Sequence, residues 1–131
     1  MITVRSTLSA LVIAAALIGG VAGPASAHHS FAFYDMTKTA EITGTVRKFE
    51  WSNPHSWLFV VVKTPSGAEV TYGFEMSSVG EMLRRGWKKT SVKPGDKIKV
   101  AFRPKRDGAP DGLLTNAWFG DGKMVGNGNI R

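Results

Sequence analysis

Three histidines are the residues of this chain best suited to metal chemistry, and the sequence contains no others. His28 and His29 are adjacent, and His55 lies in an Asn53-Pro54-His55 turn. If the mature chain begins at His28, that residue offers a metal two nitrogens, its α-amine and its ring Nδ1. A further imidazole, from His55 or His29, would complete the T-shaped all-nitrogen site called a histidine brace. Tetragonal nitrogen coordination favours Cu(II), so the sequence predicts a copper site.

The residue types around these histidines refine that hypothesis. An unperturbed α-amine has a pKa of about 8, so copper binding is expected to release protons and to weaken in acid. Zinc fits less well, because it prefers four tetrahedral ligands, often thiolates, and the chain has no cysteine. Met76 is a secondary candidate that would offer soft sulfur to Cu(I). Trp51 and Trp57 flank His55, where their ring faces could shield a bound cation.

Plainer roles remain open for the same residues, because spacing alone does not bring three rings together. Two histidines at a chain terminus can be exposed without binding anything. His55 can form hydrogen bonds inside its own turn, and Trp51 and Trp57 can be core residues of a small barrel.

The brace requires cleavage before His28, and the N-terminal region has the three parts of a secretory signal. A single positive charge, Arg5, precedes the uncharged apolar run 8–21, and Ala25-Ser26-Ala27 supplies small residues at the cleavage positions. A membrane anchor is the alternative, but a spanning helix needs about 20 apolar residues and this run is shorter. We expect a cleaved signal peptide at 1–27 and a periplasmic or secreted bacterial protein with no membrane span after cleavage.

Composition limits what the mature chain can be. Of 131 residues, about 100 follow the predicted cut, which is enough for one domain with a single core. The absence of cysteine excludes disulfides and thiolate chemistry. The net charge of +7 suits an anionic partner, and export argues against nucleic acid as that partner.

Apolar alternation and turn residues predict an all-β fold with one short helix. The expected strands lie at 41–51, 56–63, 70–74, 98–102 and 113–119, and the helix runs from Ser78 to Gly86. In the first strand Ile42, Gly44 and Val46 alternate on one face, and the apolar phase then shifts to Phe49 and Trp51, which indicates a bulge or a strong bend. The second is almost continuously apolar, which is typical of a strand covered on both faces.

This order of elements predicts a five-stranded Greek-key barrel like the OB-fold, with the pattern β-β-β-α-β-β. Residues 28–39 form an N-terminal segment, residues 40–122 the barrel, and residues 123–131 a C-terminal tail. We expect a monomer. The fold itself does not specify function, because the same barrel binds many kinds of ligand.

A second hypothesis concerns Trp87 and the basic residues around it, at and after the predicted helix, namely Arg84, Arg85, Lys88 and Lys89. They could dock an anionic partner or a periplasmic protein, which would make the chain a non-catalytic binding module. A solvated surface is the plainer interpretation. The sequence contains no phosphate-binding loop, nucleophile elbow or acid/base pair, so it predicts no enzyme.

The chain resembles an uncharacterised family of small exported bacterial proteins across nearly its whole mature length. The motifs that carry the resemblance are His28-His29-Ser30-Phe31, Asn53-Pro54-His55-Ser56-Trp57 and Arg84-Arg85-Gly86-Trp87. The resemblance implies export but no activity. A looser likeness to exported copper carriers lies in compartment and residue types and not in spacing.

Overall fold

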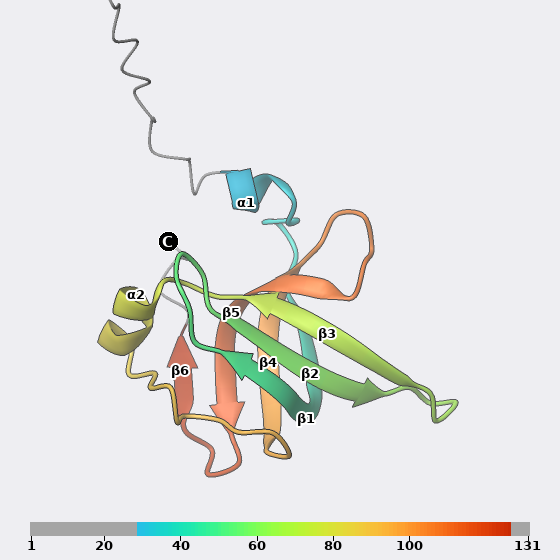
Figure 1. The fold of residues 1–131 in the computed structure, drawn as a ribbon. Helices are drawn as coiled ribbons and strands as arrows, with labels where there is room; N and C mark the ends of the chain where they lie inside the picture. The colour runs from blue at the N-terminus through green and yellow to red at the C-terminus, as the bar shows by residue number, and fades with distance from the viewer. Residues whose placement is uncertain (1–28, 127–131) are drawn as a thin grey trace, which may run out of the picture.

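The computed structural model describes residues 29–126, so the predicted signal peptide and His28 lie outside it. Figure 1 shows a small β-barrel with a short helix at each of two places. The elements along the chain are α1 (His29–Ala32), β1 (Ala40–Glu50), β2 (Trp57–Lys63), β3 (Glu69–Glu75), α2 (Val79–Arg84), β4 (Lys97–Pro104), β5 (Asp111–Phe119) and β6 (Met124–Gly126).

Five of the strands close into a barrel. The sheet order is β3-β2-β1-β4-β5-β6, with antiparallel neighbours, and β3 also pairs in parallel with β5. The parallel pairing joins Glu75 to Leu113 and closes the ring. The strand order and the position of α2 between β3 and β4 are those of an OB-type barrel, which confirms the predicted fold class.

The long, curved strand β1 holds the barrel together because it pairs with β2 on one edge and with β4 on the other. Its register with β2 shifts between Val46 and Lys48, which is the bulge predicted from the phase change. Gly44 lies where the strand passes close to β2: a Cβ there would lie 2.3 Å from the carbonyl oxygen of Val61. Curvature at this point therefore requires glycine.

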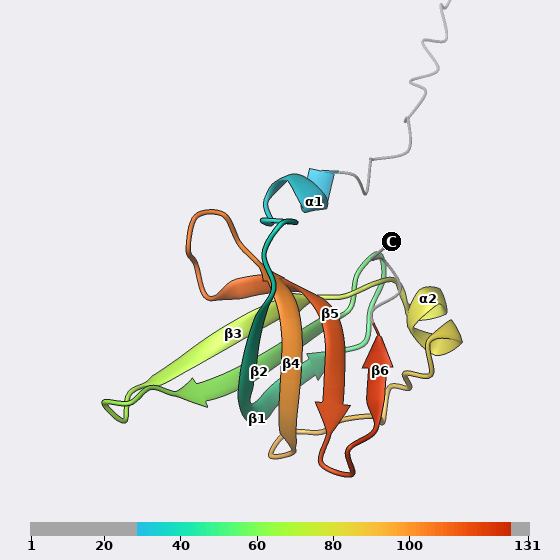
Figure 2. The ribbon, with the colours of Figure 1, turned by 180° about the vertical axis from the view of Figure 1, so that it is seen from behind.

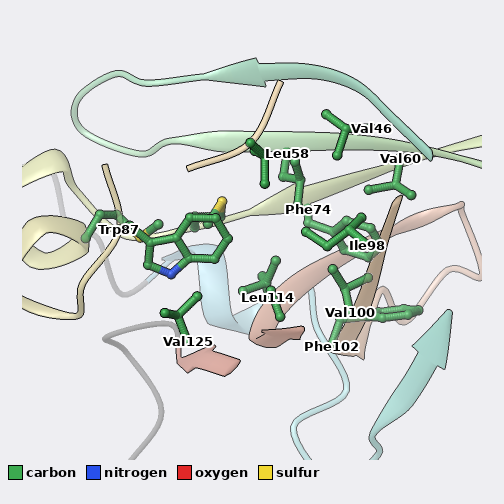
Figure 3. Packing of buried hydrophobic residues seen from close by; sticks show 14 residues of the cluster. Val46, Leu58, Val60, Phe74, Trp87, Ile98, Val100, Phe102, Leu114 and Val125 are labelled. Atoms are coloured by element: carbon green, nitrogen blue, oxygen red, sulfur yellow. The ribbon is translucent and has the colours of Figure 1, made fainter. Parts of the chain in front are cut away.

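The inward-facing residues of the strands form one hydrophobic core (Figure 3). Leu58, Val60 and Phe74 are fully buried, and Phe74 lies against Phe102 with ring centroids 4.9 Å apart. Burial of side chains of this size is the main stabilising term for a domain without disulfides.

Helix α2 closes one side of this core. Ser78 caps its N-terminus, with the Ser78 hydroxyl accepting from the Glu81 amide at 3.4 Å, and Gly86 ends it with φ of 88°. Met82 is fully buried, whereas the neighbouring Leu83 is 55% exposed, so the helix turns only a narrow apolar stripe to the core.

Two elements were missed by the sequence analysis. Helix α1 lies inside the segment 28–39, and β6, which pairs Val125 with Ala117, lies inside the predicted tail 123–131. Glycines on either side of this short apolar stretch hid the strand. Within residues 29–126, no helix has the length and apolar character needed to cross a membrane.

The close approach at Gly44 gives a direct test of the barrel. Gly44→Ala is expected to lower the free energy of unfolding by about 1–3 kcal/mol, because the methyl group must push β1 away from the Val61 carbonyl. Urea unfolding followed by circular dichroism measures the change. Gly120→Ala is the matched control, because no atom lies within 4 Å of a Cβ at that position. Equal stability of the two variants would contradict the packing described for β1.

Candidate functional site

His55 lies in a loop between β1 and β2 that is fixed by several hydrogen bonds. The Ser52 hydroxyl donates to the His55 carbonyl at 2.9 Å, and Asn53 Oδ1 accepts from the Val79 amide at 2.9 Å at the start of α2. Ser56 continues the pairing of β2 with β3, since its amide donates to the Ser77 carbonyl at 3.1 Å. The loop therefore presents the imidazole from a defined position.

The imidazole of His55 pairs with the carboxylate of Glu75, the last residue of β3. The contact joins Nδ1 of His55 to Oε1 of Glu75. The carboxylate is 7% exposed, whereas the imidazole is 21% exposed. Because a carboxylate oxygen accepts hydrogen bonds, Nδ1 is the donor, and the lone pair of the neutral ring stays on Nε2. Nε2 is the nitrogen that such a histidine offers to a metal.

The second oxygen of Glu75 accepts a hydrogen bond from the N-terminal segment. The Tyr34 hydroxyl donates to Glu75 Oε2 at 2.7 Å, and Tyr34 is 3% exposed. Burial raises the pKa of the Tyr34 hydroxyl far above its usual value, and the hydrogen bond to Glu75 and its negative charge raise it further. The hydroxyl therefore keeps its proton and donates it in the hydrogen bond to Glu75. In this way the carboxylate links Tyr34 to His55.

Further contacts tie the N-terminal segment to the barrel around Tyr34. The Asp35 amide donates to the Pro104 carbonyl at 2.8 Å, and the Arg106 amide donates to the Phe33 carbonyl at 2.9 Å. Hydrogen bonds from Thr37, and then Lys38, lower the pKa of the Asp35 carboxyl to about 2. These backbone hydrogen bonds hold the segment from Phe33 onward against the barrel.

Helix α1 precedes this docked stretch and lies at the end of the barrel where β3 ends and the β1–β2 loop turns (Figures 1 and 2). The backbone of His29 belongs to α1, five residues before Tyr34, whereas His28 lies outside the described residues. The structure therefore brings the N-terminal segment and His55 to the same carboxylate. It gives no positions for the side chains of His28 and His29.

A histidine held by a carboxylate through one ring nitrogen is the usual setting of a metal-binding imidazole, because the carboxylate fixes the tautomer and the ring orientation. Residues 29–126 contain no group of three or more histidine, cysteine or acidic side chains placed to hold a metal ion. The predicted ligand set needs two histidines whose side chains are not described, so within this range only the imidazole of His55 and its contact with Glu75 can be described.

The other residues predicted near the metal have different positions. Met76 is fully buried in the core, so its thioether does not reach the solvent. Trp51 packs against the core and meets Phe49 edge-on, with ring centroids 5.7 Å apart. Trp57 is partly exposed on the outer face of β2, directly opposite Glu75 in the register. Of the three, Trp57 lies on the same face as Glu75.

The predicted partner-binding residues divide into two groups. Trp87 is fully buried in the core (Figure 3), so its prediction as a docking residue was wrong. Its ring meets that of Phe119 edge-on, with ring centroids 5.3 Å apart. The sequence placed it after the helix-ending Gly86, where exposure is common, but the chain folds back under α2. The charged members of the group are exposed, and Arg84 and Arg85 both pair with Glu81.

Sequence reasoning missed Glu75 and Tyr34. The alternation Val70-Tyr72-Phe74 assigns Glu75 to the outer face of its strand, where an exposed carboxylate is the ordinary expectation. Its burial comes from the N-terminal segment crossing that face, which no local pattern encodes. The available signal was Tyr34 itself, which follows Phe31 and Phe33 in an aromatic stretch, because buried tyrosine hydroxyls need partners.

A family model described as a family of unknown function, DUF6152, matches residues 16–116 of the chain. No curated protein matches it. The matched range includes the whole candidate site, from His28 and His29 through Tyr34 and His55 to Glu75.

The shared carboxylate predicts that one hydroxyl holds the N-terminal segment in place. Tyr34→Phe is expected to cost about 1.5–3 kcal/mol, because it removes a hydrogen bond to a buried charged group. Hydrogen exchange of amides in residues 29–39 should also accelerate. Tyr72→Phe is the control, since the structure gives no hydrogen bond to its hydroxyl within the described range. Unchanged exchange in the Tyr34 variant would disprove the docking role of the hydroxyl.

Proposed function

This chain belongs to the family of unknown function DUF6152, and we propose that it is an exported copper-binding protein that carries, buffers or delivers the metal. The proposed ligands are the α-amine and ring of His28, set free by removal of residues 1–27, and the imidazole of His55. His29 lies next to this set as a further imidazole.

One observation carries the proposal: Glu75 accepts from both His55 and Tyr34. The first contact leaves Nε2 of His55 available, and the second anchors the N-terminal segment at the same end of the barrel. A segment fixed at Tyr34 has only six residues back to His28, which limits how far the new α-amine can lie from His55. Anchoring reduces the entropic cost of bringing the two ligands together.

Carriage fits the site better than catalysis. The residues around His55 supply a positioned imidazole and its carboxylate, but neither a nucleophile in contact with the imidazole nor a second acid/base group belongs to this set. Three nitrogen ligands with a supporting carboxylate are sufficient to hold Cu(II) and to release it to a better ligand set.

A second candidate function is docking of an anionic or protein partner through the basic residues at α2. It draws support from Lys88 and Lys89, which are exposed and have no acidic partner among residues 29–126. With Trp87 in the core, this surface lacks the aromatic anchor that strong interfaces use, so copper binding remains our first proposal.

A copper titration of the mature protein tests the first proposal. The protein is produced with its own leader, purified from the periplasm and titrated with Cu(II) by calorimetry and electron paramagnetic resonance. We expect one tight equivalent with nitrogen hyperfine lines. The signal should be lost in His55→Ala and in a chain with one extra residue before His28, because each change removes a nitrogen from the set.

Two further variants serve as a matched pair. Glu75→Gln keeps the size of the side chain but not its charge, and it is expected to weaken copper binding about 10–100-fold, as loss of a supporting carboxylate typically does. Tyr72→Phe should leave the affinity unchanged. Weak binding that survives both the extension and His55→Ala would refute the proposal and direct attention to Lys88 and Lys89.

A further inference from the structure

The outer face of β2 carries apolar side chains that are not fully buried by the described part of the chain. Leu58 and Val60 are fully buried in the core, whereas the alternate residues Trp57, Phe59 and Val61 point outward and stay partly exposed. The sequence predicted a strand covered on both faces, but within residues 29–126 nothing covers this face completely. The rings of Trp57 and Phe59 lie nearly parallel to each other, with centroids 6.3 Å apart and planes 19° apart, and we call this pair of rings the platform.

A groove of about 930 Å³ lies along the outer face of the curved strand β1. Thr43, Thr45 and Val61 contribute to its lining. Arg47 joins it to a smaller hollow of about 220 Å³ that is lined by Phe59 and the neighbouring polar residues Lys48 and Thr71. We call the groove, the hollow and the platform together the β1–β2 groove.

Cations on three strands surround this groove. Lys97 on β4 donates to Thr45 Oγ1 at 2.6 Å, and Arg47 on β1 donates to Thr71 Oγ1 at 3.3 Å. Lys63 on β2 is the third cation. Within residues 29–126 none of the three pairs with a carboxylate, although many other lysines of the chain do. Their charges are therefore available to a ligand.

Hydroxyl groups and one acid complete the lining. Thr43, Thr45 and Thr71 offer neutral donors and acceptors, and Glu69 lies opposite Lys63 in the β2–β3 register. A carboxylate in a binding groove accepts from the hydroxyl groups of a ligand and repels closely spaced anions. The combination suits a ligand with many hydroxyl groups and widely spaced negative charges.

We propose that the β1–β2 groove binds a linear acidic polysaccharide, one sugar ring of which stacks on Phe59 and Trp57 while its carboxylates meet Arg47, Lys63 and Lys97. Sugar rings have an apolar face that packs on flat aromatic surfaces, and their hydroxyl groups match the threonines and Glu69. Carboxylates spaced one per ring suit cations that are distributed over three strands.

A single-stranded nucleic acid is the closest competitor, because stacking platforms and positive grooves also bind bases and phosphates. Two features of the groove favour the polysaccharide. The carboxylate of Glu69 would repel a phosphate chain, which carries one negative charge per nucleotide. Three cations whose charge is partly cancelled by Glu69 are also few for such a chain. The cations of the groove, Arg47, Lys63 and Lys97, are separate from His55 and Glu75, so their proposed contacts do not depend on copper.

Isothermal titration with polygalacturonate oligomers tests the proposal, with neutral dextran and single-stranded DNA as comparison ligands. We expect saturable binding of polygalacturonate, weaker binding at high salt and no binding of dextran. The double variant Arg47→Ala/Lys63→Ala and the single variant Phe59→Ala should each weaken binding about tenfold. Circular dichroism establishes that each variant is folded.

The matched control is Lys88→Ala/Lys89→Ala, which removes the same number of charges from a different surface. Unchanged binding in this control, together with loss in the groove variant, supports the groove. An equal loss in both double variants would mean that only net charge matters and would overturn the proposal. Tighter binding of DNA, equal binding of dextran, or no binding of polygalacturonate would overturn it as well.

Discussion

The carboxylate of Glu75 imposes the constraint on which the candidate site depends. A buried charge costs several kcal/mol unless hydrogen bonds compensate it. Here two donors do so, and they come from segments that are distant in sequence: Tyr34 from the N-terminal segment and His55 from the β1–β2 loop. The requirement to satisfy one acid therefore fixes the docking of the first segment and the orientation of the imidazole at the same time.

The barrel places this carboxylate where both donors can reach it. Glu75 ends β3 at the point where that strand pairs with Leu113 of β5, so its backbone is held on both sides. Within residues 29–126 the outer face of β2 stays partly exposed, and β1 passes close to β2 at Gly44. The candidate site at Glu75 and the cation Lys63 of the β1–β2 groove lie at opposite ends of β2.

Much of the fold could be predicted because its signals are local. Alternating apolar residues identified five strands, the phase change at Gly44 identified the bulge, and Ser78 and Gly86 marked the ends of α2. The site was harder, since Glu75 and Trp87 are buried by segments that arrive from elsewhere in the chain. Spacing identified His55, whereas the partner that orients it required the three-dimensional structure.

The parallel pairing of β3 with β5 has a consequence for the order of events during folding. Glu75 can pair with β5 only after Leu113 has been synthesised, and the second edge of β1 can pair only after β4 has been synthesised. A chain of this topology cannot complete its barrel while its C-terminal quarter is still being synthesised. Contacts of such long sequence separation slow folding. Until β5 has been synthesised, the barrel therefore stays open along the edge of β3.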